Sequence, residues 1–359
     1  MTQSELQESL ATKIRQCFGA AASITALSAL AGDASSRRYY RAKLSGAGAV
    51  SSVIVMQLPQ ESALPLSSEE LAIFKEPLKE LPFLNVHRFF AKVGVRVPKL
   101  HDYWAEDGIL ILEDLGDQPL WDRVQNLSDT EVASWYRKAI DELLIVQLRG
   151  TAARDESCIA FQQRFDSRLY MWEFDHFLQY GLSARPDVSI DADVLGELKN
   201  IFTMIARDLD NEPPVLAHRD YHSWNLMIHE GHIAVIDFQD ALLAPAQYDL
   251  ASLLNDRITD RVITPALETQ LIEYFLTRRR EVGGAVVSRD HFWQVYLLSA
   301  IQRDLKVVGR FYYLDIVKGK PGYMQFVPAT LHRLKRNMAR LPATQRLIPL
   351  LADHFDELR

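Results

Sequence analysis

Three oxygen-bearing side chains in the C-terminal half of the chain have the types and spacing that phosphoryl transfer requires. In HRDYHSWNLMIHEGHIAVIDFQD, residues 218–240, Asn225 follows Asp220 by five positions and Asp237 comes twelve positions later. A carboxylate such as Asp220 can orient a hydroxyl group and accept its proton. Mg²⁺ prefers oxygen ligands, and Asn225 and Asp237 offer one neutral and one charged oxygen. We therefore predict transfer of a phosphoryl group from a Mg²⁺-bound nucleotide to a hydroxyl, a reaction that depends mainly on positioning and charge neutralisation.

The same stretch also has structural interpretations. Asp220 could cap a turn or a helix, which is a common role of aspartate. We expect His218 to be buried and bonded to the backbone around the loop. We also expect Asp240 and Asp249 to order loops or to cap the following helix.

The histidines and cysteines do not predict a zinc site. His229 and His232 lie on the turn of an expected hairpin, and no cysteine or third ligand of suitable spacing accompanies them. Cys17 and Cys158 lie far apart in the chain, so we expect no disulfide and favour a reducing compartment.

Length and composition bound the class of protein. The chain has 359 residues, of which 48% are apolar, so we expect two lobes with a large core. The net charge of −7 argues against nucleic acid as the main partner. The polar N-terminus, MTQSELQESLATKIRQ, has no signal-peptide core, and no run approaches the roughly 18 apolar residues of a membrane span. We expect a cytoplasmic protein with a small-molecule substrate, no membrane and no obligate protein partner.

The elements around these residues change character near residue 115. Residues 1–115 combine an amphipathic helix, a proline-interrupted helical segment and several short strands; the strand-like runs are RRYYRAKL, SSVIVMQLP, GVRVPKLHDYW and GILILEDLGD. Residues 116–359 have mainly helical periodicity, with one strand pair, VLAHRD and IAVIDF, around Asp220. We therefore predict an α+β fold with a small sheet-containing lobe over residues 1–115 and a larger helical lobe over residues 116–359.

Two motifs within residues 218–240 resemble those of a known family. HRDYHSWN fits the catalytic-loop pattern H-R-D-x-x-x-x-N, and IDFQ has Gln239 where the Asp-Phe-Gly motif of kinases has glycine. Over residues 28–330 the chain resembles the aminoglycoside phosphotransferase and choline kinase group of protein-kinase-like small-molecule kinases. The resemblance implies a bilobal protein-kinase-like fold that uses ATP and Mg²⁺. It also implies that Asp220 is the catalytic base and that Asn225 and Asp237 are the metal ligands.

Further motifs narrow the resemblance. GDASSRRYYR, LILEDLGD, VIDFQDALLAPAQYDLASLLND, QRDLKVVGRF and GKPGY are together similar to bacterial kinases of peptidoglycan recycling. Those enzymes use ATP to phosphorylate the anomeric hydroxyl of N-acetylmuramate or N-acetylglucosamine, so the resemblance implies such an amino sugar as the acceptor.

The resemblance also implies a set of nucleotide contacts. GDASSRRYYR would cover the phosphates, because backbone N–H groups, hydroxyls and the planar fork of arginine all bind phosphate oxygens. The linker LILEDLG would contact adenine through its backbone. The residues expected to contact the nucleotide are Gly32, Ser35, Ser36, Arg37, Arg38, Met56, Glu113 and Leu115. A charged surface hairpin is the alternative interpretation of the first segment.

The lysine that kinase-like folds carry on the third strand is absent. Met56 in VIVMQ stands at its position, and the following helix, PFLNVHRFFAKVG, has no acid to pair with such a lysine. Another cation must then meet the nucleotide phosphates. We expect it among Arg37, Arg38 and Arg41, and we favour Arg38.

Two helical stretches are candidates for the acceptor site. Trp172 and Glu173 lie in the aromatic run RLYMWEFDHFLQYGL, and Gln302, Arg303 and Lys306 lie on one helical face in SAIQRDLKVVGRF. A packed helix and a solvated surface are the respective alternatives. The basic face suits a neutral or carboxylate-bearing sugar better than a cationic antibiotic.

Two other functions remain open at this point. The chain could phosphorylate another small alcohol, such as an aminoglycoside, choline or homoserine. It could also be a nucleotide-binding pseudokinase that acts as a scaffold, although the retained Asp220, Asn225 and Asp237 argue against this.

Overall fold

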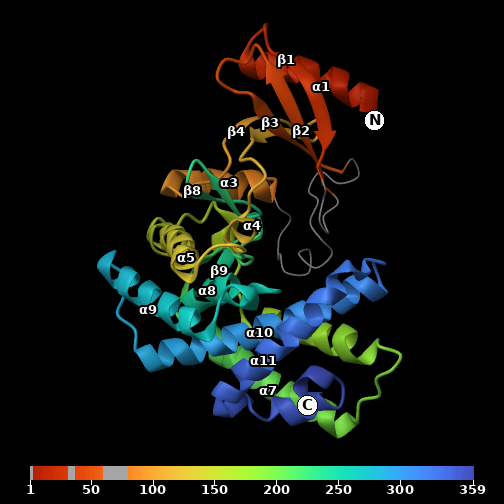
Figure 1. The fold of residues 1–359 in the computed structure, drawn as a ribbon, viewed down its shortest axis with the longest axis vertical. Coiled ribbons are helices and arrows are strands. Elements are labelled where there is room, and N and C mark those ends of the chain that lie inside the picture. Colours follow the sequence, from red (N-terminus) through yellow and green to blue (C-terminus); the bar gives the residue numbers. More distant parts are fainter. Residues whose placement is uncertain (1–2, 31–36, 60–79) are drawn as a thin grey trace.

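The computed structural model describes residues 3–30, 37–59 and 80–359, with side chains from residue 7 onwards. A small lobe built on a β-sheet lies above a larger helical lobe (Figure 1). Three of the expected phosphate contacts, Gly32, Ser35 and Ser36, lie outside the described residues.

The small lobe contains a five-stranded antiparallel sheet in the order β1-β2-β3-β5-β4. Its strands are β1 (Ser23–Ala29), β2 (Arg38–Ser45), β3 (Ser52–Gln57), β4 (Leu100–Trp104) and β5 (Ile109–Glu113). Strand β1 is an addition to the strands expected from the sequence. The last strand ends at Glu113, so the sheet is complete before the chain enters the helical lobe.

The two faces of this sheet pack against different partners, because side chains alternate along a strand. Val53 and Val55 of β3 belong to a core shared with Leu10 and Ile14 of α1 (Gln3–Phe18). The intervening Ile54 and the fully buried Met56 belong instead to the large core that contains α3 (Pro82–Val93). The Met56 face of the sheet is therefore the one directed toward the helical lobe.

The helical lobe is organised around α10, a helix of 28 residues that packs against α6, α7, α8 and α11. Its helices are α4 (Leu120–Val124), α5 (Asp129–Leu144), α6 (Ser167–His176), α7 (Ala192–Asp210), α8 (Ala246–Leu254), α9 (Pro265–Glu281), α10 (Arg289–Ile316), α11 (Val327–Arg340) and α12 (Leu347–Ala352). π-Helical turns η1 (Ile145–Gly150) and η3 (Phe177–Ser183) continue α5 and α6. Within the described ranges, no helix is both long enough and apolar enough to cross a membrane.

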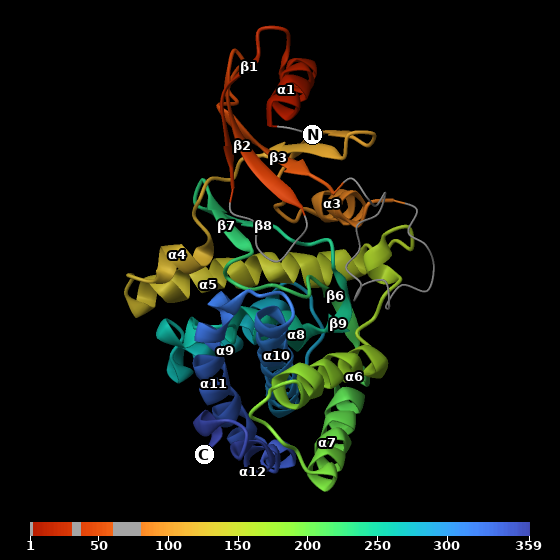
Figure 2. The same cartoon turned by 90° about the vertical axis from the view of Figure 1, so that its right-hand side faces the viewer.

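Two small antiparallel strand pairs hold the catalytic motif. Strands β6 (Pro214–Ala217) and β9 (Leu242–Pro245) pair with each other, as do β7 (Leu226–His229) and β8 (His232–Val235). Figure 2 shows β7 and β8 between the five-stranded sheet and α5. The expectation of one strand pair is therefore wrong: IAVI pairs with LMIH, and VLA pairs with the later LLAP.

The hairpin turn between β7 and β8 matches the expectation for His229 and His232, which face each other across it. Glu230 and Gly231 between them have φ values of 51° and 78°. Positive φ at both central residues is the geometry that a two-residue hairpin turn requires.

Candidate active site

The expected catalytic loop, residues 218–225, is anchored by a buried aspartate. Asp249, in the first turn of α8, is fully buried and accepts hydrogen bonds from the backbone nitrogens of His218 at 2.6 Å and Arg219 at 3.0 Å. The ring of His218 bonds the carbonyl oxygen of Ile236 at 2.9 Å. Arg219 has φ of 79°, a left-handed conformation that costs an L-residue about 1–2 kcal/mol. The expected loop-ordering role of Asp249 and the burial of His218 are both confirmed.

The two expected metal ligands converge. The side-chain nitrogen of Asn225 donates to the backbone oxygen of Asp220 at 3.0 Å and lies 3.4 Å from Oδ2 of Asp237. Oδ1 of Asp237 accepts a hydrogen bond from Gln239 at 2.9 Å. The replacement of the usual glycine by Gln239 thus adds a side chain that orients the carboxylate.

This pair fits Mg²⁺ by the chemistry of its donors. Asn225 and Asp237 offer one amide oxygen and one carboxylate, and Mg²⁺ is commonly held by one or two such groups together with water and substrate phosphates. Among the residues that the structure describes, no group of three or more His, Cys, Asp or Glu side chains could hold a metal alone. An ion bound here would therefore complete its shell with water and phosphate oxygens.

Asp220 lies on this loop, and its side chain is near two cations of α10. Its side chain is 36% exposed, and Oδ1 lies 3.8 Å from Nη1 of Arg303 and 3.8 Å from Nζ of Lys306. Burial alone would raise the pKa of Asp220, but Lys306 and Arg303 outweigh it and hold this pKa well below its usual range. This low pKa favours the ionised carboxylate, which is the form that can take up the proton of a hydroxyl.

Arg303 is enclosed rather than solvated. Its side chain is 3% exposed and donates to the backbone oxygen of Arg219 at 2.8 Å. The guanidinium lies 5.1 Å from the ring centroid of Tyr248 and 3.9 Å from the carboxylate of Asp256. The interpretation of this helical face as solvated surface is wrong, and direct substrate contact by Arg303 would require these contacts to open.

Gln302 and Glu173 form a second enclosed pair. Gln302 is fully buried and donates to Oε2 of Glu173 at 2.7 Å, while Glu173 itself is 1% exposed. Oε1 of Glu173 lies 3.3 Å from Nζ of Lys306. This geometry favours a supporting role for both residues over the expected direct substrate contact. Trp172, the neighbour of Glu173 on α6, is half-buried and packs 5.8 Å from the ring of His176.

On the nucleotide side, Met56 occupies the third strand as expected. It is fully buried and lies opposite Tyr39 of β2 in the strand register. The helix PFLNVHRFFAKV, which has no acid, forms α3. The structure thus places a neutral side chain at the third-strand position.

The strand register separates the candidate arginines. Arg37 directly precedes β2 and lies close enough to Tyr39 to lower its pKa, whereas Arg38 shares the opposite face of the strand with Tyr40, which packs toward α1. Burial raises the pKa of Tyr39, while Arg37 lowers it and Asp237 raises it, which places Tyr39 near both charges. The register therefore argues against Arg38 and in favour of Arg37 as the cation beside the phosphates.

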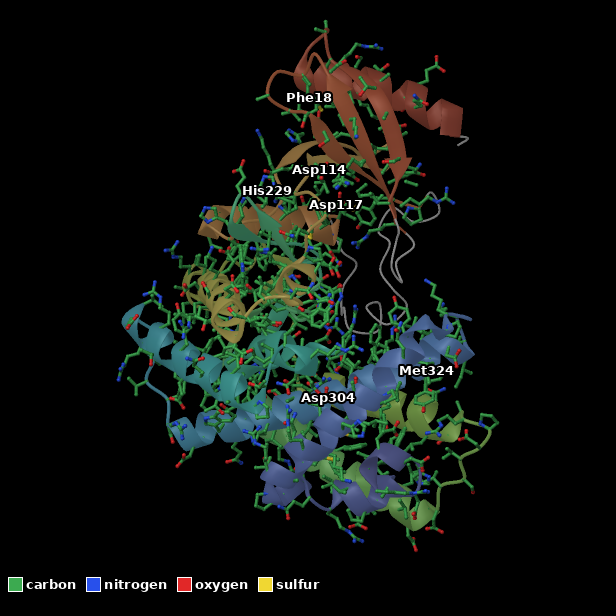
Figure 3. All side chains as sticks on the ribbon, viewed as in Figure 1. Phe18, Asp114, Asp117, His229, Asp304 and Met324 are labelled. Atoms are coloured by element: carbon green, nitrogen blue, oxygen red, sulfur yellow. The ribbon has the colours of Figure 1, made fainter. Side chains whose placement is uncertain are left out.

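Arg41 has a different role. Its guanidinium donates to both carboxylate oxygens of Asp114 at 2.7 and 2.9 Å, to Asp117 at 2.7 Å and to the backbone oxygen of Gly116 at 3.2 Å. Asp114 and Asp117 lie where the sheet meets the helical lobe (Figure 3). Arg41 thus ties β2 to the linker. Sequence reasoning missed this pairing, because its partners lie more than 70 positions away and only the run of acids in LEDLGD hinted at them.

The expected adenine contacts at the linker are restricted by existing bonds. The carboxylate of Glu113 pairs with Arg96 through two bonds of 2.7 and 2.6 Å, and its backbone nitrogen donates to the carbonyl oxygen of Lys99 at 2.8 Å. Leu115 is 5% exposed. The side chain and the backbone amide of Glu113 are therefore already engaged within the protein.

Comparison with known proteins agrees with this geometry. Residues 26–283 match the model of the phosphotransferase enzyme family, APH. The chain belongs to this family. The predicted class of enzyme, a phosphotransferase, is confirmed.

Curated relatives span most of the chain. The N-acetylmuramate/N-acetylglucosamine kinase of Pseudomonas aeruginosa is 30% identical over 324 residues, covering 89% of this chain and 86% of the relative. The kinase of the same name from Neisseria meningitidis serogroup B is 28% identical over 328 residues, covering 90% and 89%.

Solved structures confirm the protein-kinase-like fold. Choline kinase LicA from Streptococcus pneumoniae aligns with a TM-score of 0.60 at 15% identity, over 94% of this chain and 99% of that one. The ADP-bound aminoglycoside phosphotransferase APH(2'')-Ib aligns with a TM-score of 0.59 at 14% identity, over 92% and 97%. At these identities the likeness establishes the fold alone.

Proposed function

We propose that this phosphotransferase is an ATP- and Mg²⁺-dependent sugar kinase. Its proposed acceptor is the anomeric hydroxyl of N-acetylmuramate or N-acetylglucosamine. The observation that carries the proposal is that the side chains of Asn225 and Asp237 converge next to the loop that carries Asp220. The names of the relatives at 28–30% identity support an amino sugar as the acceptor.

In the proposed mechanism, Asp220 orients the acceptor hydroxyl. The hydroxyl oxygen forms a bond to the γ-phosphorus of ATP while the bond from that phosphorus to the bridging oxygen breaks, and the hydroxyl proton passes to Asp220. Asn225 and Asp237 would hold Mg²⁺, which neutralises phosphate charge when bound. The anomeric hydroxyl is the most acidic hydroxyl of a reducing sugar, because the ring oxygen withdraws electron density from it. This property suits a weak base such as Asp220.

The test is a panel of acceptors with ATP and Mg²⁺: N-acetylmuramate, N-acetylglucosamine, choline, homoserine and an aminoglycoside. We expect turnover with one or both sugars, and phosphorus–carbon coupling in the NMR spectrum that assigns the product to C1. A product phosphorylated at O6 would refute the anomeric assignment. Turnover confined to another alcohol would refute the sugar assignment, and ATP binding without turnover on any acceptor would indicate the pseudokinase alternative.

The two proposed metal ligands, Asn225 and Asp237, should contribute unequally to nucleotide binding. Asp237→Ala should abolish Mg²⁺-dependent ATP binding, and Asn225→Ala should weaken it less, because a charged oxygen binds Mg²⁺ more strongly than a neutral one. Calorimetry with ATP, in the presence and absence of Mg²⁺, measures both effects. Equal Mg²⁺-ATP affinity in the Asp237 variant and the wild type would remove this residue from the metal site.

Arg37 and Arg38, at the start of β2, are predicted to differ in their contribution to ATP binding. Arg37→Ala should raise KM for ATP at least about tenfold, on the order of the 1.5–3 kcal/mol of a charge-assisted hydrogen bond. Arg38→Ala is the matched control, because this arginine neighbours Arg37 in sequence but lies on the other face of the strand. Steady-state kinetics with ATP varied would test the pair. A larger effect from Arg38→Ala would show that the register argument is wrong.

A further inference from the structure

The segment of the loop that follows Asp220 brings no lysine or arginine to the site. Residues 220–225, DYHSWN, contain neither lysine nor arginine. His222 is the one basic side chain in this run, and burial, its largest influence, lowers its pKa. The positive charge near Asp220 comes from Lys306 and Arg303 of α10 and, to a smaller extent, from Arg219, which is paired with Glu173.

These two cations differ in what they can reach. Arg303 is 3% exposed and is already engaged by the backbone oxygen of Arg219 and by Asp256. Lys306 is 20% exposed, and its Nζ contacts two carboxylates, Glu173 at 3.3 Å and Asp220 at 3.8 Å. Lys306 is thus the more exposed of the two cations and the one that a ligand can contact.

Glu173 fixes the ammonium of Lys306 in place. The Glu173 carboxylate is itself held by Gln302 at 2.7 Å and by Arg219 at 3.4 Å, and it is 1% exposed. Burial alone would lower the pKa of Lys306, but Glu173 and the other nearby anions raise it above its usual value. Lys306 therefore remains charged, and a rigid neighbour limits where its Nζ can go.

The position of this charge relative to the reaction follows from Asp220. An acceptor hydroxyl must come within about 2.6–3.2 Å of the Asp220 carboxylate to donate its proton. Nζ of Lys306 lies 3.8 Å from that carboxylate. When the hydroxyl bonds the same oxygen, Oδ1, the ammonium and the acceptor oxygen are at most about 7 Å apart. A phosphoryl group that arrives at the acceptor from the Lys306 side then has an oxygen within reach of Nζ.

We propose that Lys306 is a catalytic residue whose ammonium donates a hydrogen bond to the phosphoryl group as it passes to the acceptor. Lys306 keeps its proton throughout: the acceptor oxygen gains the bond to phosphorus, ADP leaves with the bridging oxygen, and Asp220 takes the hydroxyl proton. Glu173 and Gln302 are positioning residues for Lys306. This inference rests on the proposed function.

The experiment compares Lys306→Met, Lys306→Arg and Glu173→Gln with the wild type on N-acetylglucosamine and N-acetylmuramate. Lys306→Met should lower kcat by about 10²–10³-fold with both sugars, as loss of one preorganised donor to a charged transition state does elsewhere. The calorimetric affinity for Mg²⁺-ATP should stay unchanged. Lys306→Arg should recover part of kcat, and Glu173→Gln should lower kcat less than Lys306→Met. Lys199→Met, at an exposed position of α7, is the control and should match the wild type.

The two sugars separate this role from recognition of the acceptor. N-Acetylglucosamine lacks the lactyl carboxylate of N-acetylmuramate, so a residue that reads this carboxylate would raise KM for N-acetylmuramate alone. That result, or an unchanged kcat in Lys306→Met, would overturn the catalytic role. Arg219 still pairs with Glu173 in the methionine variant, and a Lys306→Arg variant that folds normally but has no more activity than Lys306→Met would also count against the proposal. A wild-type enzyme inactive on both sugars would instead overturn the proposed function.

Discussion

Replacing Asp220 by asparagine is expected to lower kcat by about 10²–10⁴-fold, the usual effect of losing a positioned base. Asparagine has nearly the same size as aspartate, but its amide cannot accept the proton of the acceptor hydroxyl. The nucleotide should still bind, because Asn225 and Asp237 are retained. Steady-state kinetics, together with calorimetric titration of Mg²⁺-ATP, would measure the two properties separately.

The structure also indicates that Asp220→Asn should fold normally. In Asp220→Asn, Arg303 keeps Asp256 as a partner and Lys306 keeps Glu173, so neither cation loses all of its compensation. The melting temperature should therefore stay close to that of the wild type. Asp122→Asn, at an exposed position of α4, is a matched control. Near-normal kcat in Asp220→Asn would exclude Asp220 from the mechanism.

Replacing Arg333 by methionine is expected to destabilise the protein by about 3–5 kcal/mol, the cost of breaking a buried ion pair from one side. Arg333 of α11 is 0% exposed, and it bonds Asp304 of α10 at 2.7 and 3.2 Å. It also bonds Asp260 at 3.2 Å and the backbone oxygen of Arg257 at 2.9 Å. Asp304 lies deep in the helical lobe (Figure 3), so water cannot easily replace the lost guanidinium.

Arg346→Met provides the matched control for this substitution. Arg346 also makes a two-bond pair, with Glu197 at 2.6 and 3.0 Å, but the two side chains are 60% and 39% exposed. Exposed pairs contribute only about 0–1 kcal/mol, so chemical denaturation should show a small loss for this variant. Equal losses from the two substitutions would show that burial of Arg333 does not decide its contribution.

The buried carboxylate of Asp304 also predicts how the loss of stability in Arg333→Met varies with pH. Burial raises the pKa of Asp304 to about 7 although Arg333 lowers it. Without Arg333 this pKa should rise further above its unfolded value. A carboxylate whose folded-state pKa is raised loses stability as pH rises from its unfolded pKa to its folded pKa. Because the wild type undergoes the same loss up to about pH 7, the deficit of Arg333→Met should be level below that pH and grow above it. Adding Asp304→Asn should remove this pH dependence and recover part of the stability.

The sequence by itself determined the parts of this protein in which function depends on local spacing. Asp220 and Asn225 are five residues apart on one loop, and Asp237 follows the strand that pairs beside them, so their convergence follows from short-range geometry. The strands β2 to β5 of the small lobe were predictable for the same reason, since β-branched runs such as VIV favour a pleated surface, whereas β1 was missed. Met56 at the third-strand position was likewise correctly placed on its strand.

Only the tertiary structure decided which side chains meet across long separations. Helical spacing put Gln302, Arg303 and Lys306 on one face, but it could not show that this face is enclosed against Glu173 and Asp220. Periodicity locates a polar stripe without naming what packs on it, because burial depends on elements that are distant in the chain.

The same limit explains why the roles of Arg37, Arg38 and Arg41 could not be predicted from the sequence. Pairing with β3 decides the register of β2 and so puts Arg38 on the face of Tyr40, away from Tyr39. Arg41 was a reasonable phosphate ligand by composition, until the fold brought Asp114 to within 2.7 Å of it. Local chemistry is encoded in short segments of the chain, whereas the partners of a long charged side chain are chosen by how whole elements pack.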